Sequence, residues 1–222
     1  MWLINSSVGR KVVMSLTGLF LILFVTFHAV MNAVAIFSLE NYEAVCEFLG
    51  ANWYALLGTA VIAGGAVLHI FYAFWLTMQN RKARGNDAYA VSSRPKNVEW
   101  ASQNMLVLGI IIFCFLALHL FHFWAKMQLP EMMGDHPMGG EDALAAVFKQ
   151  VWVLPVYLVA FVALWFHLTH GFWSAFQSIG TTNDKWICRF KCIGFWWSTI
   201  AVGLFVVEAI YFTLHFLEVI PF

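Results

Sequence analysis

Histidine is the residue type in this sequence whose number and placement could carry chemistry. Of eight histidines, seven fall within long apolar stretches: His28, His69, His119, His122, His167, His170 and His215. An ionisable side chain is costly in such surroundings and needs a hydrogen-bond partner, a role in proton transfer or a metal to ligate. One such histidine is more often a packing residue than a ligand, but four apolar stretches that each supply one favour metal ligation.

The composition places these histidines in lipid. The chain has 222 residues, of which 62% are apolar and 11% are charged, whereas an average soluble domain has about 25% charged residues. The formal net charge is zero, so no global basic field favours nucleic acid as a partner. The sequence also lacks a Gly-rich phosphate loop. We therefore expect a membrane protein, with any chemistry on a water-soluble substrate left to another subunit.

Five apolar runs are long enough to cross about 30 Å of hydrocarbon. They lie at roughly residues 12–36, 53–79, 101–126, 151–177 and 193–217. The sequence thus predicts an all-α membrane protein, a single domain over residues 1–222, in which five transmembrane helices form a bundle. The acidic connection after the first run is either a short helix on the membrane surface, over residues 39–50, or a solvated loop.

Charged residues are divided between the two ends of these runs. Basic residues lie before the first run and in the second and fourth connections, at Arg10, Lys11, Arg81, Lys82, Arg84, Arg94, Lys96, Lys185, Arg189 and Lys191. Acidic residues lie in the first and third connections, at Glu40, Glu43, Glu47, Glu131, Asp135, Glu141 and Asp142. By the positive-inside rule, we expect the N-terminus and the basic segments on the cytoplasmic side.

Depth in the membrane pairs four of the histidines. A position along a helix becomes a height at about 1.5 Å per residue. By that measure His28 and His119 lie about 16 to 18 residues from the inner ends of their spans, and His69 and His167 about 10 residues from theirs. Two imidazoles at one height, on opposite faces of a flat macrocycle, are the ligands of six-coordinate haem iron. The spacing therefore predicts two stacked b-type haems.

Two further histidines keep alternatives open. His122 follows His119 by three residues, and His170 follows His167 by three, so each shares a helix face with its predecessor. Depth favours the first histidine of each close pair as the haem ligand. The second would then bond a haem propionate, line a quinone pocket or extend to the membrane interface. Chelation of a separate metal by each close pair is disfavoured, because no carboxylate or thiolate accompanies them at a suitable spacing.

The segments around the predicted ligands resemble a known family. They are VTFHAV (25–30), VLHIFY (67–72), ALHLFHFW (117–124) and FHLTHGFWSAF (166–176), together with the opening SSVGRKVVMSLTG (6–18). The chain resembles, over nearly its whole length, the dihaem cytochrome b anchor of quinol:fumarate reductases and succinate:quinone oxidoreductases, the class with one five-helix polypeptide. The resemblance implies that His69 and His167 hold a proximal haem near the partner subunits, and that His28 and His119 hold a distal haem near the outer face.

The resemblance also implies partners and a reaction. Members of that family sit in the bacterial cytoplasmic membrane and exchange electrons between menaquinol or menaquinone and an iron–sulfur subunit. An FAD-containing flavoprotein subunit then interconverts fumarate and succinate. Both subunits bind on the cytoplasmic side, where the basic connections of this chain are expected. A dimer of the whole complex is compatible with the resemblance.

Quinone chemistry needs a group that handles protons. Some members of the family carry a glutamate two residues before the ligand of the fourth helix, but this sequence has Trp165 there. The expected candidates are Glu43 and Glu47 in the first outer connection and Glu208 in the outer half of the fifth span. The alternative is solvation for Glu43 and Glu47, and a buried hydrogen bond to a neighbouring helix for Glu208.

Two other functions are weighed against this one. The dihaem anchor of another respiratory oxidoreductase, such as a nitrate reductase, would draw its ligands from fewer helices. A proton-coupled transporter could use the histidines as a relay. A transporter would be expected to have broken helices or internal repeats, and Pro155, near the start of a span, is the one proline that suggests a break.

Overall fold

The computed structural model describes residues 6–50, 52–84 and 99–221, and every regular element among them is a helix. Five helical segments are long and apolar enough to cross a membrane: Ser7–Phe37, Trp53–Lys82, Trp100–Trp124, Val153–Ser178 and Asp184–Phe216. The predicted all-α fold and number of spans are thus confirmed. In chain order the elements are α2 (Ser7–Phe37), α3 (Leu39–Phe48), α4 (Trp53–Arg84), α5 (Trp100–His119), η1 (Leu120–Trp124), α6 (Gln128–Met133), α7 (Gly140–Phe148), α8 (Val153–Ser178) and α9 (Asp184–Phe216).

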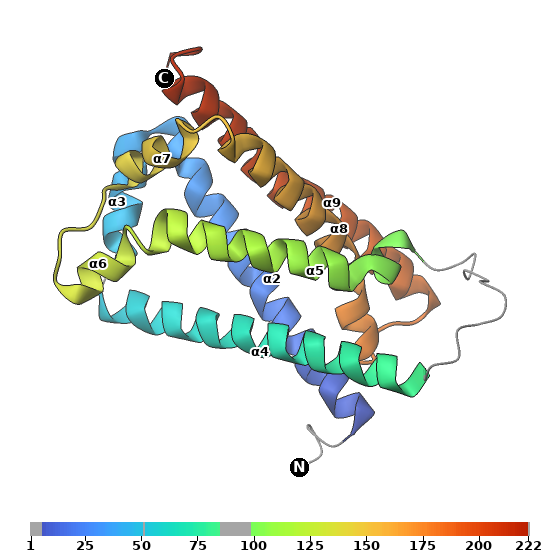
Figure 1. Ribbon diagram of the computed structural model, residues 1–222. Helices are drawn as coiled ribbons and strands as arrows, with labels where there is room; N and C mark the ends of the chain where they lie inside the picture. The colour runs from blue at the N-terminus through green and yellow to red at the C-terminus, as the bar shows by residue number, and fades with distance from the viewer. Residues whose placement is uncertain (1–5, 51, 85–98, 222) are drawn as a thin grey trace.

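The long helices form one bundle. Helices α8 and α9 lie side by side, and α2 packs against α4, α8 and α9 (Figure 1). Helix α5 packs mainly on α8 and makes little contact with α4. Among the helices that carry the predicted ligands, α2 therefore packs on α4 and α8, and α5 packs on α8.

The two ends of the bundle differ in charge. Helices α3, α6 and α7 gather at one end, and α2 begins at the other end, where α8 turns into α9 (Figure 1). We name the first the acidic end, after Glu40, Glu43, Glu47, Glu131, Asp135, Glu141 and Asp142. We name the second the basic end, after Arg10, Lys11, Arg81, Lys82, Lys185, Arg189 and Lys191. Arg94 and Lys96, also expected there, lie outside the described residues.

Polar caps decide where the helices begin. The side chain of Ser38 accepts a hydrogen bond from Asn41 N and so starts α3, while the Ser38 N–H donates to Val34 O and closes α2. Asn183 starts α9, because its Oδ1 accepts from the backbone N–H groups of Lys185 and Trp186. The predicted start of this span at residue 193 is therefore wrong. Charged side chains end an apolar run, but they do not end a helix whose first turn is capped.

The connections at the acidic end contain more helix than expected. The first connection is the helix α3, and the third contains α6 and α7, which the sequence did not predict. The buried face of α7 packs onto the core with Ala143, Leu144, Val147 and Phe148. A short amphipathic helix of this kind is stabilised by what it covers, so a search for long apolar runs misses it.

Helices α8 and α9 are in close contact where Gly194 faces Phe172. A Cβ at Gly194 would lie 2.9 Å from Cδ1 and 3.0 Å from Cβ of Phe172, whereas a Cβ at Gly203 would have no neighbour within 4 Å. We expect Gly194→Ala to lower the thermal midpoint of the protein in detergent, since overpacking costs about 1–3 kcal/mol. Gly203→Ala, on the same helix, should leave it unchanged or raise it. Equal midpoints for the two variants would contradict this account of the packing.

Candidate functional site

The structure brings the four predicted ligands together in two pairs. The ring centroids of His28, on α2, and His119, at the end of α5, are 5.7 Å apart. Those of His69, on α4, and His167, on α8, are 6.3 Å apart. We name them the acidic-end pair and the basic-end pair, after their relative positions along the bundle. An imidazole nitrogen lies about 2 Å from a metal that it ligates, so two rings across one ion have centroids roughly 6 Å apart. Both separations are compatible with one shared metal ion per pair.

Aromatic side chains surround the acidic-end pair. Phe24 stacks on His28 with ring centroids 5.4 Å apart and an angle of 24° between the ring planes. Three more rings lie 5.1 to 5.8 Å from one of the two histidines, namely Phe115, Phe123 and Phe205. Such walls exclude water and lower the local dielectric constant, which suits a cofactor that carries electrons rather than one that hydrolyses a substrate.

The Nδ1 atoms of the four predicted ligands have different partners. Nδ1 of His69 lies 3.2 Å from Oγ1 of Thr17, and Nδ1 of His28 lies 3.3 Å from Nδ2 of Asn32. Nδ1 of His119 and of His167 is buried without a hydrogen-bond partner among the described residues. A buried polar atom left without a partner costs about 1–3 kcal/mol. Each pair therefore contains one imidazole, that of His119 or that of His167, whose Nδ1 no described residue engages.

Thr17 and Asn32 were not singled out from the sequence. Asn32 follows His28 by four residues, so helical periodicity could have found it. Thr17 reaches His69 only because α2 packs closely on α4. A Cβ at the adjacent Gly18 would lie 3.3 Å from Cε1 of His69. No local pattern in the sequence predicts the contact between Thr17 and His69.

His122 is engaged by α8. Its Nδ1 lies 2.9 Å from the hydroxyl of Tyr157, and the two rings stack with an angle of 13° between their planes. The span changes from α-helix to π-helix directly after His119, and π-helical turns often occur at functional sites. Because of this change, His119 faces His28 while His122 is buried against Tyr157. The span ends at Trp124, two residues before the predicted end at residue 126.

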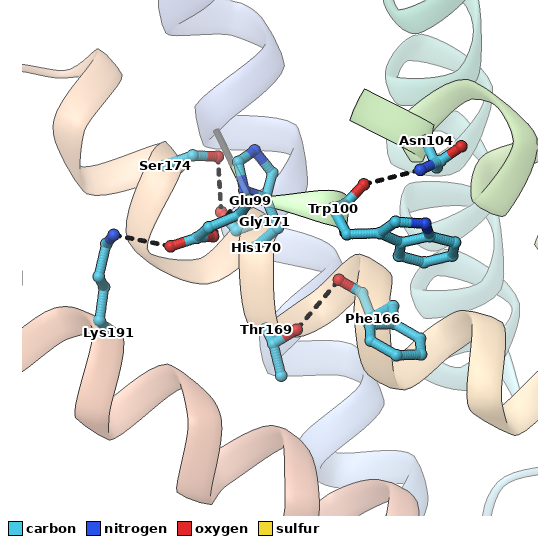
Figure 2. Close-up of polar contacts among 9 residues, drawn as sticks. All are labelled: Glu99, Trp100, Asn104, Phe166, Thr169, His170, Gly171, Ser174 and Lys191. Carbon is cyan, nitrogen blue, oxygen red and sulfur yellow. Dashed lines mark hydrogen bonds and ion pairs between the residues drawn. The ribbon is translucent and has the colours of Figure 1, made fainter. Parts of the chain in front are cut away.

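His170 is held at the basic end by charged groups. Figure 2 shows Glu99, just before α5, between His170 of α8 and Lys191 of α9. The Glu99 carboxylate lies 3.5 Å from His170 Nδ1 and 2.7 Å from Lys191 Nζ. Burial alone would raise the pKa of Glu99, but hydrogen bonds from Lys191 and His170 outweigh it and hold that pKa below its ordinary value. The contacts of the ionised Glu99 with Lys191 and His170 thus stabilise the fold at neutral pH. This stabilisation is lost as the pH falls through the lowered pKa of Glu99. It is small, below about 1 kcal/mol, because the groups are partly exposed.

The three carboxylates predicted to handle protons lie in two different parts of the structure: one is buried in α9, and two lie on α3. Glu208 is 8% exposed within α9, and its Oε1 has no hydrogen-bond partner in the described part of the chain. Glu43 accepts hydrogen bonds from the N–H groups of Gly140, at 2.7 Å, and Glu141, at 3.2 Å, and so holds the start of α7. Glu47 is exposed. Glu43 and Glu47 share a surface hollow of about 620 Å³, together with Glu40, Glu141 and Asp142.

An apolar groove of about 370 Å³ lies between α2 and α3, at the acidic end of the bundle. It is lined by Phe27, Met31, Ala44, Val45, Phe48 and Leu49. Phe27 directly precedes His28 in the chain. The groove and the acidic hollow lie against the same short helix, α3, because Ala44 lines both.

Trp165 stands at the position where some members of the family that this chain resembles have a glutamate. Its Nε1 donates a hydrogen bond to Thr199 Oγ1 at 3.0 Å. The side chain therefore ties α8 to α9, and an indole N–H cannot accept a proton at this position.

A cluster of three or more His, Cys, Asp or Glu residues able to hold a metal ion does not occur among residues 6–50, 52–84 and 99–221. Haem iron needs only two protein ligands, so this finding is compatible with either pair. Comparison of the chain with protein-family models, with curated proteins and with solved structures finds no match.

Proposed function

We propose that this chain is a dihaem cytochrome b and serves as the membrane anchor of a quinol:fumarate reductase or succinate dehydrogenase. The observation that carries the proposal is the presence of two histidine pairs, each drawn from two helices, at two depths of one apolar bundle. In this assignment His69 and His167 hold the proximal haem b, and His28 and His119 hold the distal haem b. Two pairs at separations suited to a shared metal favour a cofactor over simple packing.

The polypeptide would hold and insulate the redox groups. Bound haem supplies a one-electron carrier, for which no amino-acid side chain of the bundle substitutes. Four imidazoles ligate, and Thr17 orients the ring of His69 through its Nδ1. The rings of Phe24, Phe115, Phe123 and Phe205 would keep water from the acidic-end site.

Exchange with menaquinol or menaquinone is assigned to the acidic end. The apolar groove beside Phe27 suits an isoprenoid quinone that enters from lipid, because its lining is almost wholly apolar. Oxidation of a quinol releases two electrons and two protons, so a proton acceptor must stand near the ring. We assign that role to the buried carboxylate of Glu208, with Glu47 and Glu43 in the hollow as the exit toward water.

The basic end is assigned to the partner subunits. Arg81, Lys82, Lys185 and Arg189 are exposed there, and a charged rim favours fast and specific association with an acidic surface. In the proposal this end faces the bacterial cytoplasm, where it binds the iron–sulfur subunit. The FAD-containing flavoprotein, which interconverts fumarate and succinate, attaches through that subunit.

A reduced-minus-oxidised absorption spectrum tests the proposal, combined with a count of extracted haem per polypeptide. We expect low-spin, bis-histidine haem b at about two per chain, since the bundle offers two ligand pairs. A folded, helical preparation from cells able to make haem that contains none would overturn the proposal. That result would instead favour the proton-coupled transporter.

A further inference from the structure

The helical span that carries His119 contains one turn of a rare kind. Directly after His119 the α-helix changes to the π-helix η1, in which the Ala125 N–H donates to the carbonyl oxygen of Leu120, five residues earlier, at 2.8 Å. In a regular α-helix His119 and His122 would share one face, and the wider turn moves His122 off that face. Because π-helical turns are rare in proteins, we looked for contacts from outside the turn that hold it in place.

Tyr157 of α8 is hydrogen-bonded to the middle residue of this turn. Its hydroxyl lies 2.9 Å from Nδ1 of His122, and the two rings stack with an angle of 13° between their planes. Both side chains are only 3% exposed. If His122 rotated back to the face of His119, the Tyr157 hydroxyl and Nδ1 of His122 would lose each other as partners. A buried polar group without a partner is unfavourable, so this hydrogen bond opposes a return to regular α-helix.

The position of Tyr157 is fixed by other aromatic rings. Phe148 of α7 and Phe161 of α8 lie with their ring centroids 5.7 Å and 5.9 Å from that of Tyr157. Phe115 of α5 packs edge-to-face on Tyr157 with ring centroids 4.8 Å apart, and the same Phe115 ring lies 5.7 Å from His119. Tyr157 is therefore a firmly packed point against which the end of the α5 span is held.

His119 depends on this support because its ring has no hydrogen bond to orient it. Nδ1 of His69 has a hydroxyl nearby and Nδ1 of His28 has an amide, whereas Nδ1 of His119 is buried with no hydrogen-bond partner in the described part of the chain. Nδ1 of His167 also lacks a partner there, but His167 lies within the regular helix α8. The direction of the His119 ring is thus set by the backbone at the π-helical turn.

We propose that Tyr157 is a positioning residue for the acidic-end iron ligand. By its hydrogen bond to His122 it keeps the π-helical turn in place, and the turn keeps His119 directed at His28. The inference rests on the proposed haem function. It involves no transfer of an electron or a proton and no change of a covalent bond. The basic-end pair is drawn from α4 and α8 and does not depend on this turn.

The rate at which the reduced, full-length protein binds carbon monoxide in detergent tests the inference. Carbon monoxide reaches a bis-histidine iron only when one axial histidine leaves it, so the reaction reports how firmly the ligand is held. Tyr157→Phe keeps the ring and removes the hydroxyl. We expect carbon monoxide to bind the acidic-end haem about fivefold faster in this variant, the factor that corresponds to one lost hydrogen bond. The acidic-end component is identified as the one missing from His119→Ala.

Tyr54→Phe is the matched control, and two variants of His122 test the other side of the hydrogen bond. The Tyr54 hydroxyl donates to the carbonyl oxygen of Phe48 at 2.7 Å, at the same end of the bundle, and its loss should leave both haems as in the wild type. His122→Leu removes the partner of the Tyr157 hydroxyl and should repeat the increase in rate. His122→Asn keeps an amide near that hydroxyl and should reverse part of the increase.

The outcomes separate the inference from the haem proposal. If the protein binds two haems and Tyr157→Phe reacts with carbon monoxide at the wild-type rate, Tyr157 does not position His119. An equal increase at both haems would also overturn the inference, because it would indicate a general loosening of the bundle. Should Tyr157→Phe fail to fold, equal rates in His122→Leu and His122→Asn would overturn it. A folded wild-type protein without haem would instead overturn the proposed function.

Discussion

Replacing His119 with alanine is expected to reduce the haem content from about two to about one per polypeptide and to abolish quinol-dependent electron transfer. His119 is one of two rings at the acidic-end pair, and the nearby His122 is engaged by Tyr157. The remaining haem should be low-spin, because the basic-end pair is untouched. His167→Ala should remove the other haem. Pyridine haemochrome quantification and the absorption spectrum provide the measurement.

His170→Gln is the matched control for this experiment. His170 lies three residues from His167 but is held by Glu99 at the surface of the basic end rather than facing a second histidine. Both haems should therefore be retained. If His119→Ala kept both haems while His122→Phe lost one, the ligand would be His122 and our reading of the π-helical turn would be wrong.

Glu208→Gln is expected to slow quinol oxidation about 100-fold while leaving both haems in place, since proton transfer by a positioned side chain contributes about 10²–10⁴-fold. Glutamine preserves the shape of the side chain but cannot accept the proton. Glu208 is buried, and its Oε1 has no hydrogen-bond partner among the described residues, so this oxygen is suited to take up a proton. Turnover with a soluble menaquinol analogue and haem content would be measured on the same preparation.

Glu40→Gln is the control for Glu208. Glu40 lines the acidic hollow on the exposed side of α3, so its loss should change the rate little. Unchanged turnover in Glu208→Gln would remove Glu208 from the proton route. Equal slowing in both variants would indicate a general effect of charge at the acidic end.

Much of the architecture was predictable because lipid restricts the choices. A chain in hydrocarbon must satisfy its own backbone hydrogen bonds, so long apolar runs become helices. The lengths of the apolar runs then predicted five spans, and the structure confirms this number with five helices long enough to cross a membrane. Depth depends only on distance along a helix, and for that reason the sequence could match His28 with His119 and His69 with His167 before any contact was known. The structure places the members of each matched pair within 6.3 Å of one another.

Rotation and packing were beyond the reach of the sequence. The π-helical turn that separates His119 from His122, the contact of Thr17 with His69 and the engagement of Glu43 by α7 each depend on how two helices meet. The start of α9 at Asp184 depends on a cap rather than on hydrophobicity. The sequence by itself determined the class of fold, the residue types and their heights in the bundle. The tertiary structure alone decided which atoms face one another, because small rotations of packed helices redirect side chains without leaving a periodic signal in the sequence.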